Sequence, residues 1–353
     1  MLKHFRSLAL AMPLALMALP AVAQDLTWRV PTSVPEGSPF YVNFLERFAG
    51  NVDLMTGHRV KVEPFGAGVL VPALQVYDAV KNGIVEGGHS TPSYLVNKDP
   101  INAIFAGFPG GMGPESFITW IYEEGGKDKL AEIRAAEGLK SLVVGIGSSE
   151  VMAHANVAIT KAEDLKGLKY RTSGPWAEVM RDYFGAVPVV VPPGEIYTLL
   201  ERKGVDAIEW GPPSANMPEG FHQAAKYIIV PGVHQPTFLW EVVVKLDTWK
   251  AVPDDVKPLI EAAAELTTMQ GLYNFYAKDV AAMATYRAGK NEVITLDPAF
   301  AKQMSDAGAD WIAKKAATEK AAGRDGMSRI LADYQSFQKT WTEESSYLIR
   351  NAK

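Results

Sequence analysis

Two predicted strands in this chain end on side chains of opposite charge. Residues 164–171, Asp-Leu-Lys-Gly-Leu-Lys-Tyr-Arg, end one strand on Arg171, and residues 204–210, Gly-Val-Asp-Ala-Ile-Glu-Trp, end the next on Glu209 and Trp210. Helical patterns alternate with these strands, and parallel strands bring their carboxyl ends to one edge, where ligand crevices form. A fixed cation and a fixed anion on one rim suit a small carboxylate ligand, alone or with a metal ion beside it.

Each of these residues has a functional and an ordinary interpretation. Arg171 carries a planar guanidinium that fits a carboxylate through two parallel hydrogen bonds, or it is a surface arginine at a strand end. Glu209 is either solvated on a loop or turned into the crevice, where an ionised carboxylate needs an arginine or a hard cation as partner. Trp210 either packs in the core or forms a wall of the ligand pocket and offers its carbonyl oxygen to a cation.

Two further oxygen donors sit at the ends of predicted elements. Glu150 lies in a Ser-Ser-Glu turn, and Gln235 lies in the segment Gly-Val-His-Gln-Pro at 232–236; each could equally be an exposed loop residue. The six histidines form no paired metal motif, so single structural or surface histidines are expected. No Gly-x-Ser-x-Gly segment occurs, and nothing supplies the base, nucleophile and oxyanion donors that a hydrolase requires together.

Residues 1–23 have the features of a secretory signal. Lys3 and Arg6 provide the positive start, residues 8–19 form an apolar run, and Ala21-Val22-Ala23 is a small-residue cleavage site. The run is too short to span a bilayer, and no other stretch reaches the roughly 18 apolar residues that a span requires. The sequence therefore predicts export to the periplasm or the cell exterior, with Gln24 as the new amino terminus.

Composition excludes several classes of function. The whole chain has 35 Lys and Arg, so loss of Lys3 and Arg6 with the signal leaves 33 against 40 acidic residues, a net charge of −7. That balance offers no basic field for nucleic acid. The absence of cysteine excludes disulfides, thiolate catalysis and zinc–thiolate sites. An apolar content of 48% is sufficient for a chain held together by its core.

The remaining pattern predicts an α/β protein with two domains. Residues 24–146 read as a first lobe of alternating strands and helices, residues 147–235 as a second lobe, and residues of about 236–300 as segments that cross back to the first. The last part, 299–353, contains two long helical patterns over 299–322 and 327–350. They either cap their own domain or reach a second subunit, and the sequence leaves both open.

At these residues the chain resembles the periplasmic solute receptors of tripartite ATP-independent (TRAP) transporters of the dicarboxylate-receptor type. The resemblance covers essentially the whole mature chain. It rests on the opening Trp-Arg-Val-Pro-Thr-Ser at 28–33 with Glu-Gly-Ser-Pro at 36–39, on residues 164–171, whose arginine pairs with the substrate carboxylate in the family, and on residues 189–193, 195–200 and 204–207. It implies a two-lobed fold of the periplasmic-binding-protein type, with a ligand cleft between the lobes and long C-terminal helices.

Within the family the chain is most similar to receptors that bind a 2-oxo acid or lactate beside a metal ion. The resemblance then implies that Arg171 clamps the carboxylate and that Tyr94 donates a hydroxyl to the acid, while Glu150, Trp210 and Gln235 also contact the ligand. It implies a sodium or calcium ion bound with the ligand. The metal-binding residues that it implies are Glu209, Trp210, Gln235 and Glu150.

Glu150 departs from this branch, which has a glutamine there. A second carboxylate raises the negative charge of the site, which either favours calcium over sodium or indicates a changed ligand. The resemblance further implies membrane permease subunits as partners and a homodimer in which the C-terminal helices can exchange. Two alternatives remain. One is a receptor of the same family for a sugar acid or dicarboxylate without metal, which needs a second basic residue in the crevice. The other is a secreted metal-dependent enzyme acting on carboxylic acids.

Overall fold

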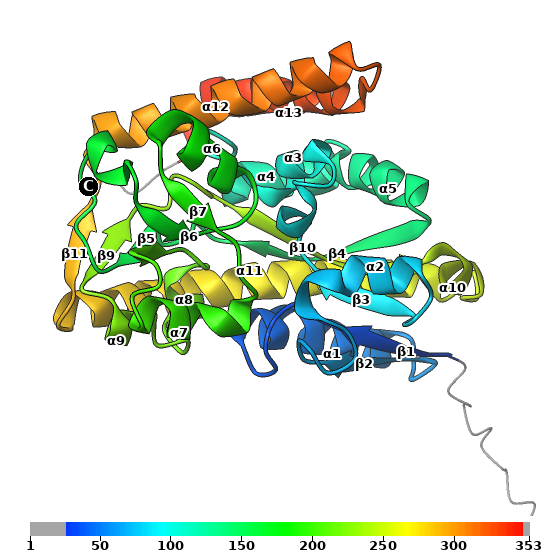
Figure 1. Cartoon of the computed structure of the whole chain (residues 1–353). Coiled ribbons are helices and arrows are strands. Elements are labelled where there is room, and N and C mark those ends of the chain that lie inside the picture. The colour runs from blue at the N-terminus through cyan, green and yellow to red at the C-terminus, as the bar shows by residue number, and fades with distance from the viewer. Residues whose placement is uncertain (1–25, 349–353) are drawn as a thin grey trace, which may run out of the picture.

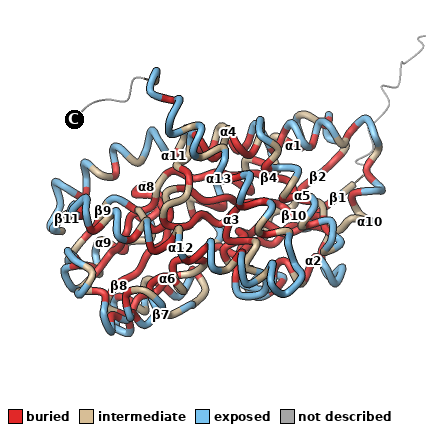
Figure 2. Tube along the Cα trace, turned by 90° about the horizontal axis from the view of Figure 1, so that it is seen from above, coloured by how far each residue is buried: buried red, intermediate tan, exposed pale blue. Residues whose placement is uncertain are grey.

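The computed structural model describes residues 26–348, so the predicted signal at 1–23 lies outside the described residues. Helices cover both sides of the sheets, with α12 and α13 along one side and α11 along the other (Figure 1). Buried positions concentrate inside this arrangement, whereas the outer helix faces are exposed (Figure 2). No helix within residues 26–348 is long and apolar enough to cross a membrane. The α/β architecture with long C-terminal helices agrees with the prediction.

The first group of strands combines four strands from the first half of the chain with β10, which comes about ninety residues later. Strands β1 (Leu26–Pro31) and β2 (Val60–Phe65) pair in parallel, and a bridge from Thr32 to His89 connects β1 to β3 (Gly87–Ser90). The strand β10 (Phe238–Lys245) lies antiparallel between β3 and β4 (Leu139–Gly147). Seven of the eight β10 residues are buried, since helices cover the sheet on both faces.

The second group is a six-stranded sheet in the order β11-β9-β5-β8-β6-β7. Strands β6 and β7 run parallel to β8, so their carboxyl ends share one edge, as the sequence predicted for Arg171 and Glu209. The members of this sheet are β5 (Ala153–Ala155), β6 (Lys169–Arg171), β7 (Val187–Val189), β8 (Ala207–Ile208), β9 (Tyr227–Val230) and β11 (Glu292–Thr295).

The chain passes between the two groups of strands after β4, after β9 and along α11. The prediction that residues 236–300 return to the first lobe differs from the structure at the end of that range. Strand β10 does join β3 and β4, but β11 pairs in parallel with β9 in the six-stranded sheet. The reason is α11 (Lys257–Ala288), a 32-residue helix that carries the chain back along both groups of strands. We propose that the two groups of strands are the cores of the two lobes.

The helices follow the predicted pattern of periodicity and breaks. Gly125 adopts a positive φ and separates α4 from α5 at a Gly-Gly pair. A short π-helical turn over Tyr41–Glu46 leads into α1. The remaining bounds are α1 (Arg47–Met55), α2 (Val76–Lys81), α3 (Ala103–Ala106), α4 (Pro114–Glu123), α5 (Gly126–Ala136), α6 (Pro175–Phe184), α7 (Ile196–Glu201), α8 (Pro213–Asn216), α9 (Phe221–Ala224), α10 (Leu246–Lys250), α12 (Pro298–Ala321) and α13 (Gly326–Glu344).

The two C-terminal helices pack on their own chain. Trp311 of α12 donates its Nε1–H to Glu178 of α6 at 3.2 Å, and the Tyr334 hydroxyl of α13 accepts from the Met112 backbone N–H at 2.5 Å. Their apolar residues belong to the same buried cluster as Trp120 of α4. Within this chain the helices therefore cover their own domain, and their contact with a second subunit stays a prediction.

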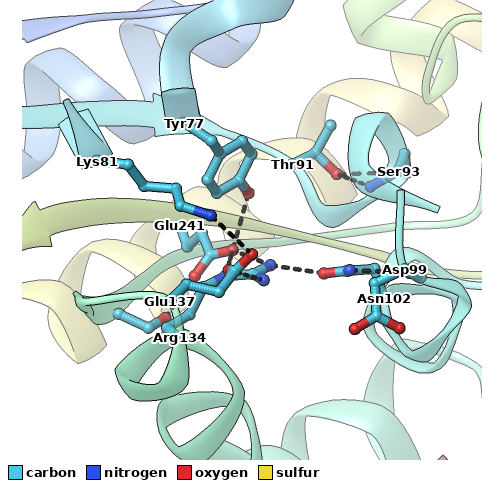
Figure 3. A network of polar contacts seen from close by, with 10 residues as sticks. Tyr77, Lys81, Thr91, Ser93, Asp99, Asn102, Arg134, Glu137 and Glu241 are labelled. Atoms are coloured by element: carbon cyan, nitrogen blue, oxygen red, sulfur yellow. Dashed lines mark hydrogen bonds and ion pairs between the residues drawn. The ribbon is translucent and has the colours of Figure 1, made fainter. Parts of the chain in front are cut away.

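A buried ionic network around Glu241 holds strand β10 in place (Figure 3). The guanidinium of Arg134 donates to Glu241 Oε1 from Nε at 2.9 Å and from Nη2 at 2.7 Å, and both side chains are fully buried. The same carboxylate accepts hydroxyl hydrogen bonds from Tyr77 at 2.8 Å and Ser141 at 2.5 Å. Arg134 also donates to Asn102 at 2.8 Å. Three segments, α2, α5 and β4, are thus tied to one carboxylate on β10, and η4 (Pro100–Asn102) is connected to it through Arg134.

Candidate ligand and metal site

Adjacent strands β6 and β8 position the two charged residues that the sequence singled out. Arg171 ends β6 and is in register with Ile208, so Glu209 follows one residue later on the same edge. The Arg171 Nη1 donates to the Glu209 carbonyl at 2.8 Å and to Glu209 Oε1 at 3.3 Å, and Nη2 donates to the Val191 carbonyl at 3.3 Å. Both side chains are almost fully buried, at 1% and 4% exposure.

The Arg171 Nε–H has no hydrogen-bond partner and is buried. A buried donor without an acceptor costs about 1–3 kcal/mol, so such a group usually serves a ligand or a strained state. A small carboxylate that accepts from Nε–H would relieve this cost. This orphaned donor is the feature of Arg171 that points most directly to an anionic ligand.

Glu150 and Gln235 are brought to the same place by the two segments that connect the groups of strands. The Glu150 backbone N–H donates to the Gln235 carbonyl at 3.4 Å, and the Gln235 Nε2 donates to the Ala106 carbonyl at 3.1 Å. A Cβ at Gly232 would overlap the Glu150 carbonyl oxygen, so only glycine permits this close approach.

All six residues that the sequence predicted for the site line one cavity, which has a volume of about 20 Å³. That volume is room for about one water molecule or ion, so an organic acid would require the surrounding segments to separate. Arg171 is the one Lys or Arg side chain among the lining residues. The cavity is lined by Phe40, Thr91, Ser93, Tyr94, Glu150, Arg171, Ser173, Glu209, Trp210, Gln235, Phe238 and Trp240.

One wall of the cavity is aromatic. The ring of Phe40 lies 5.2 Å from Trp210, 5.5 Å from Phe238 and 5.2 Å from Trp240. The Arg171 guanidinium lies 5.6 Å from the Trp210 ring centroid, within the range of a cation–π contact. A ligand held here would have its charged end at Arg171 and its apolar end against these rings. Sequence inspection did not identify Phe40, because a phenylalanine at a helix start is usually a core residue.

Glu150, Glu209 and His234 form a buried cluster of metal-binding types. One ligand atom from each lies within 4.8 Å of the others, and the His234 Nε2 is 3.2 Å from Glu150 Oε2. Sequence analysis missed His234, because it forms no paired motif; its position directly before Gln235 was the one available signal. The donor set fits a cation, since a positive charge between them would stabilise two carboxylates and an imidazole that converge in a buried site.

Burial raises the pKa of Glu150 to about 8 and the pKa of Glu209 to about 7, although Arg171 lowers both values. Burial also lowers the pKa of His234 to about 4. Each shift disfavours the charged form, because the site offers little water to solvate it. A cation would supply the missing stabilisation of both carboxylates.

Asp279 of α11 ties together the two segments that carry these carboxylates. It accepts from the Ser148 hydroxyl at 2.5 Å, and from the Ser214 N–H at 2.9 Å and hydroxyl at 2.6 Å. Ser148 lies two residues before Glu150, and Ser214 follows the segment of Glu209 and Trp210. The backbone N–H of Val151 also donates to the Gly211 carbonyl at 3.0 Å. The separation of the two carboxylates is therefore set by α11 as well as by the strands.

A larger hollow of about 470 Å³ lies between α4, α13 and Tyr276 of α11. Its lining contains Glu115 as the one charged side chain, and no cluster of metal-binding residues occurs there among residues 26–348. We therefore assign the ligand site to the smaller cavity, where several buried charges converge.

Comparison with known proteins agrees with this geometry. The sequence model of the bacterial extracellular solute-binding protein family 7 (DctP) matches residues 31–319. The monocarboxylate 2-oxoacid-binding periplasmic protein of Nostoc sp. is 29% identical over 315 residues, which is 89% of this chain and 85% of that protein.

Two solved TRAP solute-binding proteins have the same fold. That of Bordetella bronchiseptica RB50, a mixed-occupancy dimer with copurified calcium and picolinate in one active site, is 27% identical with a TM-score of 0.82, over 90% of this chain and 93% of that one. That of Pseudoalteromonas atlantica T6c, with bound sodium and pyruvate, is 25% identical with a TM-score of 0.84, over 92% and 98%. The chain therefore belongs to family 7 of the bacterial extracellular solute-binding proteins and is a solute receptor of a TRAP transporter.

Proposed function

We propose that the protein binds a small monocarboxylate with an oxygen on its second carbon, such as pyruvate, another 2-oxo acid or lactate, together with a metal ion. The observation that carries this proposal is one buried cavity with a guanidinium, whose Nε–H lacks a partner, on one side and two carboxylates on the other. An anion that also offers a second donor atom would satisfy both sides at once.

The ligands of the relatives share this chemistry. Pyruvate and picolinate both carry a carboxylate with a second donor atom on the adjacent carbon, so each can chelate a cation through two atoms. In this chain Arg171 would bind the carboxylate, and Tyr94 would donate its hydroxyl to the acid. Glu209, Glu150, Gln235 and the Trp210 carbonyl would hold the ion, with His234 as an additional donor or as the partner of Glu150. Bound there, the ion would polarise the ligand's oxygens and neutralise the buried carboxylates.

The charges of the site favour a divalent ion when both glutamates are ionised. Arg171 balances one of the two carboxylates, and a bound monocarboxylate adds another negative charge. Calcium then leaves the buried site neutral, whereas sodium leaves it with one negative charge, which burial penalises strongly. Glu150 is the source of this difference, because the site would be neutral with sodium if that residue carried no charge.

We further propose that the segments after β4 and β9 act as hinges, and that the lobes close on the acid and its ion. The ligand contacts residues from both groups of strands only in the closed form, so its binding shifts the population towards that form. The exported receptor would then deliver the acid unchanged to the membrane permease in the periplasm. The second candidate, a receptor for a sugar acid or dicarboxylate without metal, lacks the additional basic residue in the cavity lining.

A thermal-unfolding screen of the mature chain with small organic acids tests the proposal. A 2-oxo or 2-hydroxy monocarboxylate should raise the melting temperature, since ligand at 100 times its Kd stabilises the native state by about 2.7 kcal/mol. After exhaustive metal removal the shift should fall, and calcium should restore it. An undiminished shift in metal-free protein would refute the cation. Recovery of the acid unchanged after incubation would distinguish a receptor from a metal-dependent enzyme.

Replacement of Glu150 by glutamine should change the preferred ion. The amide keeps an oxygen donor and removes one negative charge, so calcium affinity should fall by about tenfold or more while sodium supports ligand binding better than before. Titration of acid binding in calcium and in sodium, by calorimetry, measures both. Glu195→Gln, at an exposed position in the same lobe, is the matched control. Unchanged ion preference in Glu150→Gln would remove Glu150 from the metal site.

A further inference from the structure

A buried amide and a buried imidazole lie behind the corner formed by Glu209 and Trp210. Asn216 ends α8, His154 lies in the middle of β5, and both residues are 0% exposed. Helix α8 packs against α11 (Figure 1). Neither residue lines the ligand cavity. Their polar atoms therefore have a purpose other than contact with the ligand.

The side-chain amide of Asn216 donates both of its hydrogens inside the fold. Its Nδ2 lies 2.8 Å from the Gly211 carbonyl oxygen and 3.2 Å from the His154 Nε2. Because Nδ2 is a donor, the imidazole accepts at Nε2 and carries its proton on Nδ1. The orientation of the amide is fixed as well, since the opposite orientation would bring its oxygen against the Gly211 carbonyl oxygen.

This arrangement leaves two buried polar atoms without a partner. The Asn216 Oδ1 and the His154 Nδ1 are both buried and make no hydrogen bond within residues 26–348. Unsatisfied buried polar groups are costly and uncommon. Packing alone does not account for this pair, because apolar side chains of similar shape would fill the same space without that cost. The contact that apolar side chains would not supply is the hydrogen bond to Gly211.

The Gly211 carbonyl is the point where the two glutamate-bearing segments meet. Gly211 comes directly after Glu209 and Trp210. Its carbonyl also accepts the backbone N–H of Val151, the residue after Glu150, at 3.0 Å. A carbonyl oxygen has two lone pairs, so it accepts from this N–H and from the buried amide at the same time. The amide therefore orients the carbonyl that connects the two segments.

The backbone at Gly211 also packs directly against the aromatic wall of the cavity. A Cβ added to Gly211 would lie 2.7 Å from Cζ of the Phe40 ring, which is too close for a side chain. His154 is in register with Ile208 of β8, one residue before Glu209. A movement of Gly211 would therefore be transmitted both to the aromatic wall and to the strand end that carries the glutamate.

We propose that Asn216 is a positioning residue of the ion site. It holds the Gly211 carbonyl in place and so sets the separation of the Glu150 and Glu209 carboxylates, and His154 in turn holds its amide. This inference rests on the proposed function, in which the two glutamates bind the ion. A divalent ion depends most on this separation, since its attraction to each carboxylate is twice that of a monovalent ion at the same distance. Asn216 thus contributes to a preference for calcium over sodium without contact with either ion.

Calorimetric titration of the mature protein with calcium, and then with pyruvate in calcium or in sodium, tests the proposal. Asn216→Ala should raise the Kd for calcium by about 10- to 100-fold, the usual effect of losing an outer contact of a metal site. The preference for calcium over sodium should fall, because the divalent ion loses more when the carboxylates separate. Asn156→Ala is the matched control, since the Asn156 amide donates to the Leu200 carbonyl at 3.4 Å and does not line the cavity.

Substitutions of His154 separate positioning from a general loss of stability. His154→Gln offers an amide oxygen that accepts from Asn216, so it should keep most of the calcium affinity. His154→Leu has no acceptor, so its loss of calcium affinity should lie between those of His154→Gln and Asn216→Ala. Both variants lose the same ring, so a purely structural role would lower the melting temperature of both and leave their Kd values for calcium equal.

Amide hydrogen exchange at Val151 reports the geometry without any ligand. Its N–H donates to the Gly211 carbonyl, so Asn216→Ala should accelerate the exchange and Asn156→Ala should not. The proposal is overturned if Asn216→Ala has the wild-type Kd and ion preference, if the exchange at Val151 is unchanged, or if His154→Gln and His154→Leu lose equal calcium affinity. A wild type that binds neither calcium nor any 2-oxo or 2-hydroxy acid would refute the proposed function, and this proposal with it.

Discussion

Replacement of Arg171 by alanine should raise the Kd for the acid by roughly 30- to 4000-fold. Truncation of one partner of a buried charge pair costs about 2–5 kcal/mol, because the other charge is left buried without compensation. In this site the ligand carboxylate loses its only Lys or Arg partner among the lining residues. Calorimetry in the presence of saturating calcium measures the effect separately from any loss of metal.

Arg171→Lys separates the charge from its geometry. A lysine keeps the positive charge but lacks the planar fork and the Nε–H that has no partner in this structure, so it should recover only part of the affinity. Arg181→Ala is the control, because Arg181 lies on the same lobe with 54% exposure and pairs with Asp182. If Arg171→Ala is folded by circular dichroism and binds the acid as tightly as Arg181→Ala does, then Arg171 is not the carboxylate-binding residue.

Replacement of Arg134 by methionine should lower the free energy of unfolding by about 3–5 kcal/mol. The carboxylate of Glu241 is fully buried and would remain in the core without a cation, which is the costly way to break a buried ion pair. The double variant Arg134→Met, Glu241→Gln should recover much of the loss, since no buried charge remains. Urea unfolding of the three proteins measures the free energies directly.

The surface pair Arg29–Glu86 provides the comparison for that experiment. Its side chains are 46% and 32% exposed, and such pairs contribute about 0–1 kcal/mol. Arg29→Met should therefore cost much less than Arg134→Met. Equal costs for the two variants would show that burial does not amplify the Arg134–Glu241 interaction. Acid binding should survive in Arg134→Met at temperatures where it remains folded, because the network lies outside the cavity.

The two sets of substitutions concern different properties: Arg171 lines the ligand cavity, whereas Arg134 stabilises β10, a strand that also contributes to the cavity wall. Trp240 of β10 lines the ligand cavity, and the next residue, Glu241, anchors the strand through Arg134 (Figure 3). The register of β10 against β4 shifts between these two residues. The network therefore holds β10 directly beside a residue that lines the ligand cavity.

The sequence alone determined the strand ends, the breaks between helices and the chemistry of the rim. Arg171 and Glu209 were found because parallel strands bring their carboxyl ends to one edge, a rule that needs only the order of the elements. The two C-terminal helices and the break between them were found because side-chain periodicity acts over a few residues. Local rules predict such features well, since the residues involved are close along the chain.

Only the tertiary structure decided which distant segments meet at the site. His234 reaches Glu150 across 84 residues, Phe40 reaches Trp210 across a longer separation, and β11 joins the sheet of β9 after the passage of α11. These contacts depend on the packing of whole elements, and the sequence close to each residue does not identify its distant partner. The exposure of apolar side chains on α11, such as Leu266 and Val280, is of the same kind, because an apolar helix face has the same pattern whether the core covers it or leaves it exposed.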